Sequence, residues 1–362
     1  MNNSVHALSG LPAIFSLVRS RGVRLLCFGW LAAVAVPQRS SAQTVKPSDA
    51  IAYVGAPGEL TKPIDIVVLR DYLVVLDESS YQPLVVFSRS DGRLVRRVGV
   101  RGPGGHSLIS PVSLEPDLEL PNALWVHDVA QAKIVRLDLS LLKRASAPVS
   151  HLRRLPPTIT VFNPIPVGGF GTFTTGFLPN TRLARVDSNG RVMDAMGQPL
   201  GDEAHPISVR QEAYRSSLAV NLQKRRVLLA SRHADRIDLY SFNGSLIATA
   251  ARPRGFEPSY DVASGPKGPV MTSGRDLRFG YVDVSTTPHK IVALYSGLSR
   301  AEAKGTAQLG REIHTMDWDG RGFRRIYLPK PALAVSVSPN DKHVYALHLS
   351  PSPSVAVYHV QP

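Results

Sequence analysis

Hydrophobic residues in this chain occur in short runs of four to six positions, separated by polar turns, from Ile64 to Val360. Runs of this length, rich in Val, Ile, Leu and Tyr and bounded by turn residues, predict β-strands. Residues 72–77 and 84–87 form one clear pair, and residues 123–128 and 133–138 form another. No segment predicts an amphipathic helix of three turns or more. The chain is therefore expected to be all-β.

The strand pairs recur along the chain at similar intervals. The turn between the second and third strand of each unit marks its position, and the markers are Asp77, Asp128, Gly176, Arg232, Ser296 and Leu349. Subtraction gives steps of 51, 48, 56, 64 and 53 residues. Spacing of roughly 40 to 50 residues is typical of β-propeller blades. Six units predict a six-bladed β-propeller, built as one domain from residues 43–362.

The last unit ends one strand short. Most units continue into a fourth strand after a tight turn such as Asp91-Gly92 or Asn243-Gly244, where glycine accepts a positive φ. After Val360 only two residues remain. We expect the N-terminal segment from Ile51 to Val54 to supply the missing strand and close the ring.

Residues 1–42 differ in character from the rest of the chain. Arg19, Arg21 and Arg24 precede an apolar run at 25–36, and small residues follow up to Ala42. This order predicts a signal peptide cleaved near Ala42 and a protein exported to the periplasm or the cell exterior. About 12 apolar residues are too few to span a bilayer, so no transmembrane span is expected in the mature chain. Retention of the segment as an anchor remains the alternative.

Charge and cysteine content limit the metal sites and the binding partners that the mature protein can have. The only cysteine, Cys27, lies in the predicted signal peptide, so disulfides and thiolate metal sites are not expected in the mature protein. Four arginines and no acids lie within residues 1–42, so the mature net charge is (42 − 4) − 28 = +10. This excess favours anionic partners, with plain solubility as the alternative. Nucleic acid is not expected, because basic runs interleaved with aromatic residues are missing.

Basic residues recur in the connections between predicted blades. Those connections, and the turns between second and third strands, share one face of a propeller around the mouth of its central channel. The residues expected on this face are Lys62, Arg101, Arg153, Arg154, Arg210, Arg252, Arg254, Arg300, Lys304 and Lys330. We hypothesise that they form a basic channel face that binds an anionic group, although chance alone would also place a basic residue in most loops.

Catalytic motifs are missing from the sequence. No Gly-x-Ser-x-Gly motif occurs, and the histidines have no metal-ligand spacing. The catalytic residues are therefore unknown, and no metal site or cofactor is predicted. Glu115 alternates with two further acids, which leaves calcium binding open, but Pro116 and Pro121 favour an edge strand or a loop there.

Two segments resemble a known family. Residues 290–360, with motifs at 293–297, 312–314, 317–320 and 343–347, resemble the C-terminal half of the bacterial TolB-like six-bladed propeller family. Residues 101–105 with Pro111 and residues 124–128 are similar to the Gly-Pro-Gly-Glu segment of that family and of NHL-type repeats, although Gly105-His106 replaces the usual Gly-Glu-Phe. The resemblance implies an exported propeller of unassigned activity and carries over no catalytic residues.

Two functional classes remain open. The first is an exported, non-catalytic binding or scaffold protein of the bacterial cell envelope, which recognises a carbohydrate, peptide or protein at the channel face. The alternative is a calcium-dependent propeller hydrolase, such as a lactonase, or a lyase. Such an enzyme should direct several acids or amides into the channel. Among the predicted inner strands only Asp65, Asn221 and Asp283 do so, which favours a binding protein with a protein or an anionic carbohydrate as its partner.

Overall fold

A computed structural model describes residues 44–45, 52–56, 58–142, 149–156, 159–250 and 252–360. The predicted signal peptide, residues 1–42, lies outside the described residues. No helix within the described ranges is both long and apolar enough to cross a membrane.

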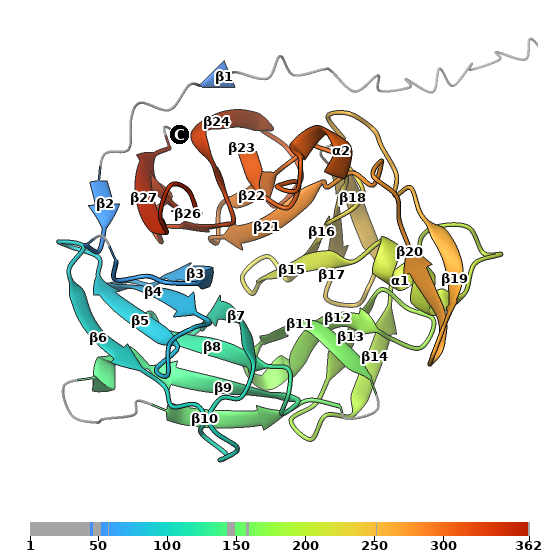
Figure 1. Ribbon diagram of the computed structural model, residues 1–362. Coiled ribbons are helices and arrows are strands. Elements are labelled where there is room, and N and C mark those ends of the chain that lie inside the picture. The colour runs from blue at the N-terminus through green and yellow to red at the C-terminus, as the bar shows by residue number, and fades with distance from the viewer. Residues whose placement is uncertain are drawn as a thin grey trace, which may run out of the picture. The chain divides into compact units, whose positions relative to one another are not determined.

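Six antiparallel sheets follow one another around a central channel (Figure 1). Blade 1 contains β3 (Pro63–Val68), β4 (Tyr72–Asp77), β5 (Leu84–Ser88) and β6 (Leu94–Val98). Blade 2 contains β7 (Pro111–Pro116), β8 (Ala123–Asp128), β9 (Lys133–Asp138) and β10 (Val149–Arg154). Blade 3 contains β11 (Thr160–Pro166), β12 (Thr172–Phe177), β13 (Leu183–Val186) and β14 (Val192–Met196).

The second half of the chain repeats this order. Blade 4 contains β15 (Ser216–Asn221), β16 (Arg226–Ser231), β17 (Ile237–Ser241) and β18 (Leu246–Ala250). Blade 5 contains β21 (Tyr281–Thr286), β22 (Ile291–Tyr295), β23 (Gly310–Met316) and β24 (Arg324–Ala332), with the short β1 (Thr44–Val45) parallel to β24. Blade 6 contains β25 (Ala334–Val337), β26 (His343–His348) and β27 (Ser354–His359). The predicted all-β, six-bladed propeller is confirmed.

The N-terminal strand lies beside the last strand of the chain. β2 (Ala52–Val54) pairs antiparallel with β27, and Val54 lies opposite Val355. This pairing gives blade 6 its fourth strand, as expected from the segment that ends at Val54. The side chain of Val54 is buried among apolar residues of blades 1 and 6.

Few elements fall outside the blades. Two short helices occupy connections: α1 (Ile207–Ala213) precedes blade 4, and α2 (Arg300–Ala303) lies between β22 and β23. Two 3₁₀ turns, Leu139–Leu141 and Gly168–Phe170, lie within blades 2 and 3. The hairpin of β19 (Asp261–Gly265) and β20 (Gly268–Thr272) lies between blades 4 and 5. It accounts for the longest step, 64 residues, in the repeat.

Apolar side chains on both faces of each blade join neighbouring blades. In β4, Leu73 and Val75 pack in the cluster shared with blade 6, whereas Val74 and Leu76 pack in the cluster shared with blade 2. Alternate residues of a strand point to opposite faces, so a strand buried on both faces is apolar throughout. Equivalent clusters join the other neighbouring blades. The continuous apolar runs of the sequence therefore hold the ring together.

Closure of the ring is tested by Val54→Asp. Val54 is 7% exposed, so the new carboxylate would be buried without a partner, and we expect the free energy of unfolding to fall by about 3 kcal/mol. Urea unfolding of the purified protein measures this change. Val100→Asp is the control, because Val100 is 42% exposed, and it should change stability by less than about 0.5 kcal/mol. Equal effects of the two substitutions would show that β2 does not contribute to the fold.

Candidate functional site

The six inner strands enclose a small cavity along the central channel. Each inner strand pairs with its own blade on one side only, so its other edge faces the channel. The cavity has a volume of about 80 Å³, and residues of all six inner strands line it. Its polar lining residues are Asp65, Ser113, Glu115, Asn163, Ser217, Asp283, Ser285, Thr286 and Ser336.

Two aspartates connect neighbouring inner strands. The backbone N–H of Leu114, in β7, donates a hydrogen bond to Asp65 Oδ2 of β3 at 2.7 Å. The backbone N–H of Val335, in β25, donates to Asp283 Oδ2 of β21 at the same distance. The other oxygen of each carboxyl accepts from the N–H of the following residue, at 2.8 Å in both cases. Each aspartate thus satisfies a backbone donor that the open strand edge would otherwise leave unpaired.

Serine hydroxyls make the same kind of connection. The N–H of Val68 donates to Ser336 Oγ at 2.9 Å, and the N–H of Val337 donates to Ser285 Oγ at 3.1 Å. The first contact links blades 1 and 6, and the second links blades 5 and 6. Much of the polar lining is therefore part of the fold.

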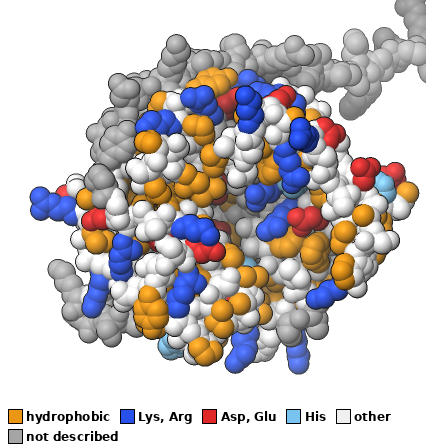
Figure 2. Space-filling view, in the orientation of Figure 1, with side chains coloured by type: hydrophobic (Ala, Val, Ile, Leu, Met, Phe, Trp, Pro, Cys, Tyr) orange, Lys and Arg blue, Asp and Glu red, His pale blue; other side chains and the backbone are white. Residues whose placement is uncertain are grey.

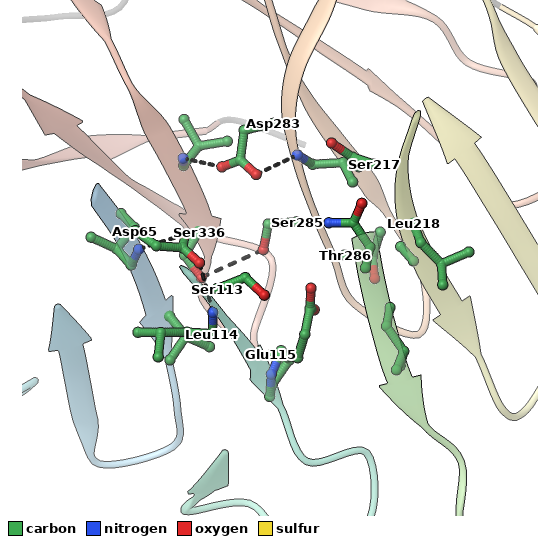
Figure 3. Close-up of a pocket in the computed structure, with 18 of the residues that line it drawn as sticks. Asp65, Ser113, Leu114, Glu115, Ser217, Leu218, Asp283, Ser285, Thr286 and Ser336 are labelled. Atoms are coloured by element: carbon green, nitrogen blue, oxygen red, sulfur yellow. Dashed lines mark hydrogen bonds between the residues drawn. The ribbon is translucent and has the colours of Figure 1, made fainter. Parts of the chain in front are cut away.

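Glu115 differs from these side chains. It projects from β7 into the space between the inner strands (Figure 3), and its carboxyl group forms no hydrogen bond within the described part of the chain. Burial, followed by the negative charges of Asp65 and Asp283, raises the pKa of Glu115 well above its usual range. Burial also raises the pKa of Asp283 to about 6. The channel thus contains more acid groups than it can ionise at low cost.

A wider cavity of about 230 Å³ forms the mouth of the channel. Residues from all six blades line it, at the beginning of the inner strands. They are Ile64, Asp65, Val112, Ser113, Phe162, Asn163, Arg215, Ser216, Ser217, Arg232, Val282, Asp283, Gln308, Leu333 and Ala334. Two of these residues, Arg215 and Arg232, carry a permanent positive charge, and both belong to blade 4 or to the connection directly before it.

The two arginines have few protein acceptors. Arg232 lies in the turn between β16 and β17, with its guanidinium carbon 5.6 Å from the ring centroid of Phe279. Its guanidinium forms no hydrogen bond or ion pair with any residue that the structure describes. Arg215 stacks on Phe162 at 4.2 Å and lies 3.8 Å from Glu212. Burial, and then the charge of Arg215, lower the pKa of Arg232.

A buried histidine reports the same positive field. Burial is the main cause that lowers the pKa of His233 to about 4, and the charges of Arg232, Arg300 and Arg215 lower it further. Figure 2 shows Lys and Arg side chains spread over one face of the molecule, with acidic side chains among them. An anion bound beside Arg232 would reduce the mutual repulsion of these groups.

Most of the ten basic residues predicted from sequence have protein partners. Arg101 donates to three backbone carbonyls, those of Glu78, Ser80 and Ile109, at 2.6, 3.2 and 2.8 Å. Arg210, in α1, donates to two carbonyls at 2.9 Å. Three others form ion pairs: Lys62 with Glu78, Arg252 with Glu257, and Arg254 with Glu312.

The remaining five lie on regular elements or directly beside them. Arg153 and Arg154, expected in a connection, are the last residues of β10, and Arg153 lies 5.4 Å from the ring of Trp125. Arg300 begins α2, Lys304 caps its C-terminus, and Lys330 lies in β24. None of the ten lines the channel or its mouth. Their recognition of an anionic group stays a prediction.

Two residues of the site, Arg215 and Arg232, were not identified from the sequence. Arg215 directly precedes β15, and Arg232 directly follows β16. An exact prediction of the strand ends in blade 4 would have placed both arginines at the mouth. Glu115 was expected on an edge strand or in a loop, because Pro116 follows it. The edge strand is confirmed: both residues belong to the inner strand β7, which is one edge of its sheet, and its channel-facing side has no strand partner and tolerates proline. Asn221, by contrast, binds Pro288 O and a turn N–H, outside the cavity lining.

Metal binding has little geometric support. No group of three or more His, Cys, Asp or Glu side chains among the described residues could hold a metal ion. Asp117, one of the three alternating acids considered for calcium, accepts the N–H groups of Glu119 and Leu120 through Oδ1.

Six sheets around a polar channel define a β-propeller protein. The chain belongs to the TolB-like six-bladed propeller family, whose model matches residues 42–340. No curated protein sequence matches the chain.

Two solved structures are similar to this protein. A member of the DUF4221 family from Bacteroides vulgatus is 9% identical, with a TM-score of 0.56, and the match covers 86% of this chain and 97% of that one. A putative exported protein from Bacteroides fragilis is 13% identical, with a TM-score of 0.54, and the match covers 88% and 98%. At these identities the similarity shows a shared fold.

Glu115→Gln tests whether ionisation of a buried acid group in the channel destabilises the fold. The folded protein binds the Glu115 proton more tightly than the unfolded chain, so stability should decline as the pH rises above about 4.3 toward the raised pKa. Glutamine removes this decline. We expect the variant to gain ~1 kcal/mol or more over the parent on going from pH 4 to pH 8, measured by urea unfolding. Exposed Glu203→Gln is the control, and an equal pH response in both variants would contradict the argument.

Arg101→Gln tests the role of one predicted basic residue. The substitution removes the charged donors that hold three carbonyls, so the free energy of unfolding should fall by about 1–2 kcal/mol. Arg154→Gln, at an exposed position of β10, should change it by less than about 0.5 kcal/mol. Thermal or urea unfolding compares the two. Unchanged stability in Arg101→Gln would leave a ligand as its main partner.

Proposed function

We propose that this protein is an exported, non-catalytic binding protein of the cell envelope that recognises an anionic group at the mouth of its channel. The observation that carries the proposal is Arg232, a partly buried guanidinium in the lining of a 230 Å³ cavity, without a protein acceptor in the described part of the chain. Partly buried charges without partners are costly unless a ligand compensates them.

Neighbouring groups support binding of an acid group at this position. Arg215 lines the same cavity, and two guanidinium groups can bind one carboxylate or sulfate through charged hydrogen bonds. Ser216, Ser217 and Gln308 add polar groups that suit a ligand with hydroxyls or amides. An anionic carbohydrate or an acidic segment of a protein has this chemistry. The positive net charge of the chain would favour its approach.

Export is part of the proposal and rests on two observations. Residues 1–42 have the order of a signal peptide, and the similar protein from Bacteroides fragilis is described as a putative exported protein. Detection of a mature N-terminus near residue 43, by mass spectrometry of the protein recovered from the cell envelope or the medium, would support it. An intact Met1 in the cytoplasmic fraction would contradict it.

The binding proposal is tested by thermal shift with D-galacturonate and inorganic sulfate, with D-galactose as the neutral control. Each anion should raise the melting temperature at 20 mM NaCl more than at 300 mM, because salt screens the arginines. Ligand at ~100 times its dissociation constant adds about 2.7 kcal/mol of stability. Arg232→Gln should weaken anion binding at least about tenfold, since a charged hydrogen bond contributes roughly 1.5–3 kcal/mol.

Arg93→Gln serves as the matched control, because the Arg93 side chain is 87% exposed in the turn between β5 and β6. It should leave anion binding unchanged. Equal shifts with galactose and galacturonate, or anion shifts that persist in Arg232→Gln, would contradict the proposal. A shift with CaCl2 that EDTA reverses would instead favour the calcium-dependent hydrolase or lyase.

A further inference from the structure

The mouth and the channel cavity are continuous. Asp65, Ser113, Asn163, Ser217 and Asp283 line both of them. A ligand held at the mouth can therefore extend past this polar ring into the channel below.

The two cavities carry opposite charge. Arg215 and Arg232 line the mouth and are not part of the channel lining, whereas Glu115 lines the channel and not the mouth. Asp65 and Asp283 lie at the boundary between them. The positive groups are thus on the outer side and the acid groups on the inner side of one continuous space.

Glu115 is the acid group available to a ligand. Asp65 and Asp283 each accept two backbone hydrogen bonds, whereas the Glu115 carboxyl accepts none among the described residues. Ser113 Oγ, which belongs to both linings, is buried and also without a hydrogen-bond partner. A donor that enters the channel from the mouth would meet an open hydroxyl and then an open carboxyl.

The size of the channel limits what can enter. A water molecule needs about 10–15 Å³ of such volume, so 80 Å³ admits several waters, or an ammonium group on a short aliphatic stem. A sugar ring is too bulky for this space. The narrow end of the ligand is therefore a small hydrogen-bond donor, and its positive charge would complement the acid groups.

We infer that the ligand of this site is a small zwitterion of the amino acid class, with its acid group on Arg215 and Arg232 and its primary ammonium directed toward Glu115. The inference rests on the anion site of the proposed function, and it names a smaller ligand for that site in place of the carbohydrate or protein segment. The ammonium would supply Glu115 with the charged donor that the protein lacks.

Binding of the ammonium is coupled to proton release. An ammonium favours ionised carboxyl groups. Burial raises the pKa of each of the channel acids Glu115, Asp65 and Asp283, so their ionisation requires a higher pH than usual. Affinity for the zwitterion should therefore increase from pH 5 to pH 8, while affinity for a simple carboxylate should not.

Isothermal titration of the purified protein with 4-aminobutyrate, butyrate and butylamine tests the inference. Glycine and 6-aminohexanoate extend the series to other spacings of the two charges. We expect at least one of these zwitterions to bind ten times more tightly than both butyrate and butylamine at pH 8. Its binding should release protons, detected as a fall in pH when ligand and protein are mixed in unbuffered solution. Glu115→Gln should abolish the preference over butyrate, whereas Glu203→Gln should retain it.

The outcomes separate the two proposals. Equal affinity for zwitterion and butyrate, with both lost in Arg232→Gln, would overturn the zwitterion and keep the anion site. Zwitterion binding that Arg232→Gln does not affect would overturn the anion site and with it the inference. A CaCl2 shift that EDTA reverses and Glu115→Gln removes would identify a metal ion in place of the amine. No binding of any of the three zwitterions would also overturn the inference. If Glu115→Gln does not fold, the presence or absence of proton release on zwitterion binding to the parent protein decides.

Discussion

The open edges of the six inner strands are the constraint on which the rest of this structure depends. A strand at the channel has a blade partner on one side and none on the other, so its backbone donors there need another acceptor. Asp65 and Asp283 provide it by accepting an N–H of the next inner strand, and Ser336 and Ser285 do the same. Polar side chains that sequence reasoning treats as candidate chemistry are thus partly structural.

The same arrangement explains why the channel can still bind a ligand. Once two carboxylates are used as connectors, a third acid group in the space becomes costly, because burial and like charge both act against its ionisation. Glu115 is that third group, and no backbone donor compensates it within the described residues. At the mouth, Arg232 carries a partly buried positive charge, and no described residue supplies it with an acceptor. One ligand that carries both charges would compensate both groups.

The fold could be predicted from the sequence, because each blade is a local pattern. Strands such as β4 are apolar throughout, and turns such as Asn243-Gly244 have residues that permit positive φ, so strand positions follow from neighbouring residues. The site could be predicted only in part. Asp65 and Asp283 were identified from the sequence. Arg101 could have faced a ligand, but it donates to three backbone carbonyls, two of which belong to residues 21 and 23 positions away in the chain. Contacts between such distant loops do not follow from the local sequence. Pro116 indicated correctly that Glu115 lies on an edge strand or in a loop, but a local rule about proline does not show that this edge faces the channel.

The pairing of β2 with β27 also has a consequence for how the protein folds. Val54 and Val355 lie opposite each other, 355 − 54 = 301 residues apart in the chain. Hairpins inside each blade can form as soon as their own residues are free, whereas this contact requires both ends of the domain at once. During synthesis, β2 must therefore stay solvated and without its partner β27 until almost the entire chain has left the ribosome. Ring closure is then a late folding step, and before it the edge of β27 is open to the wrong partners.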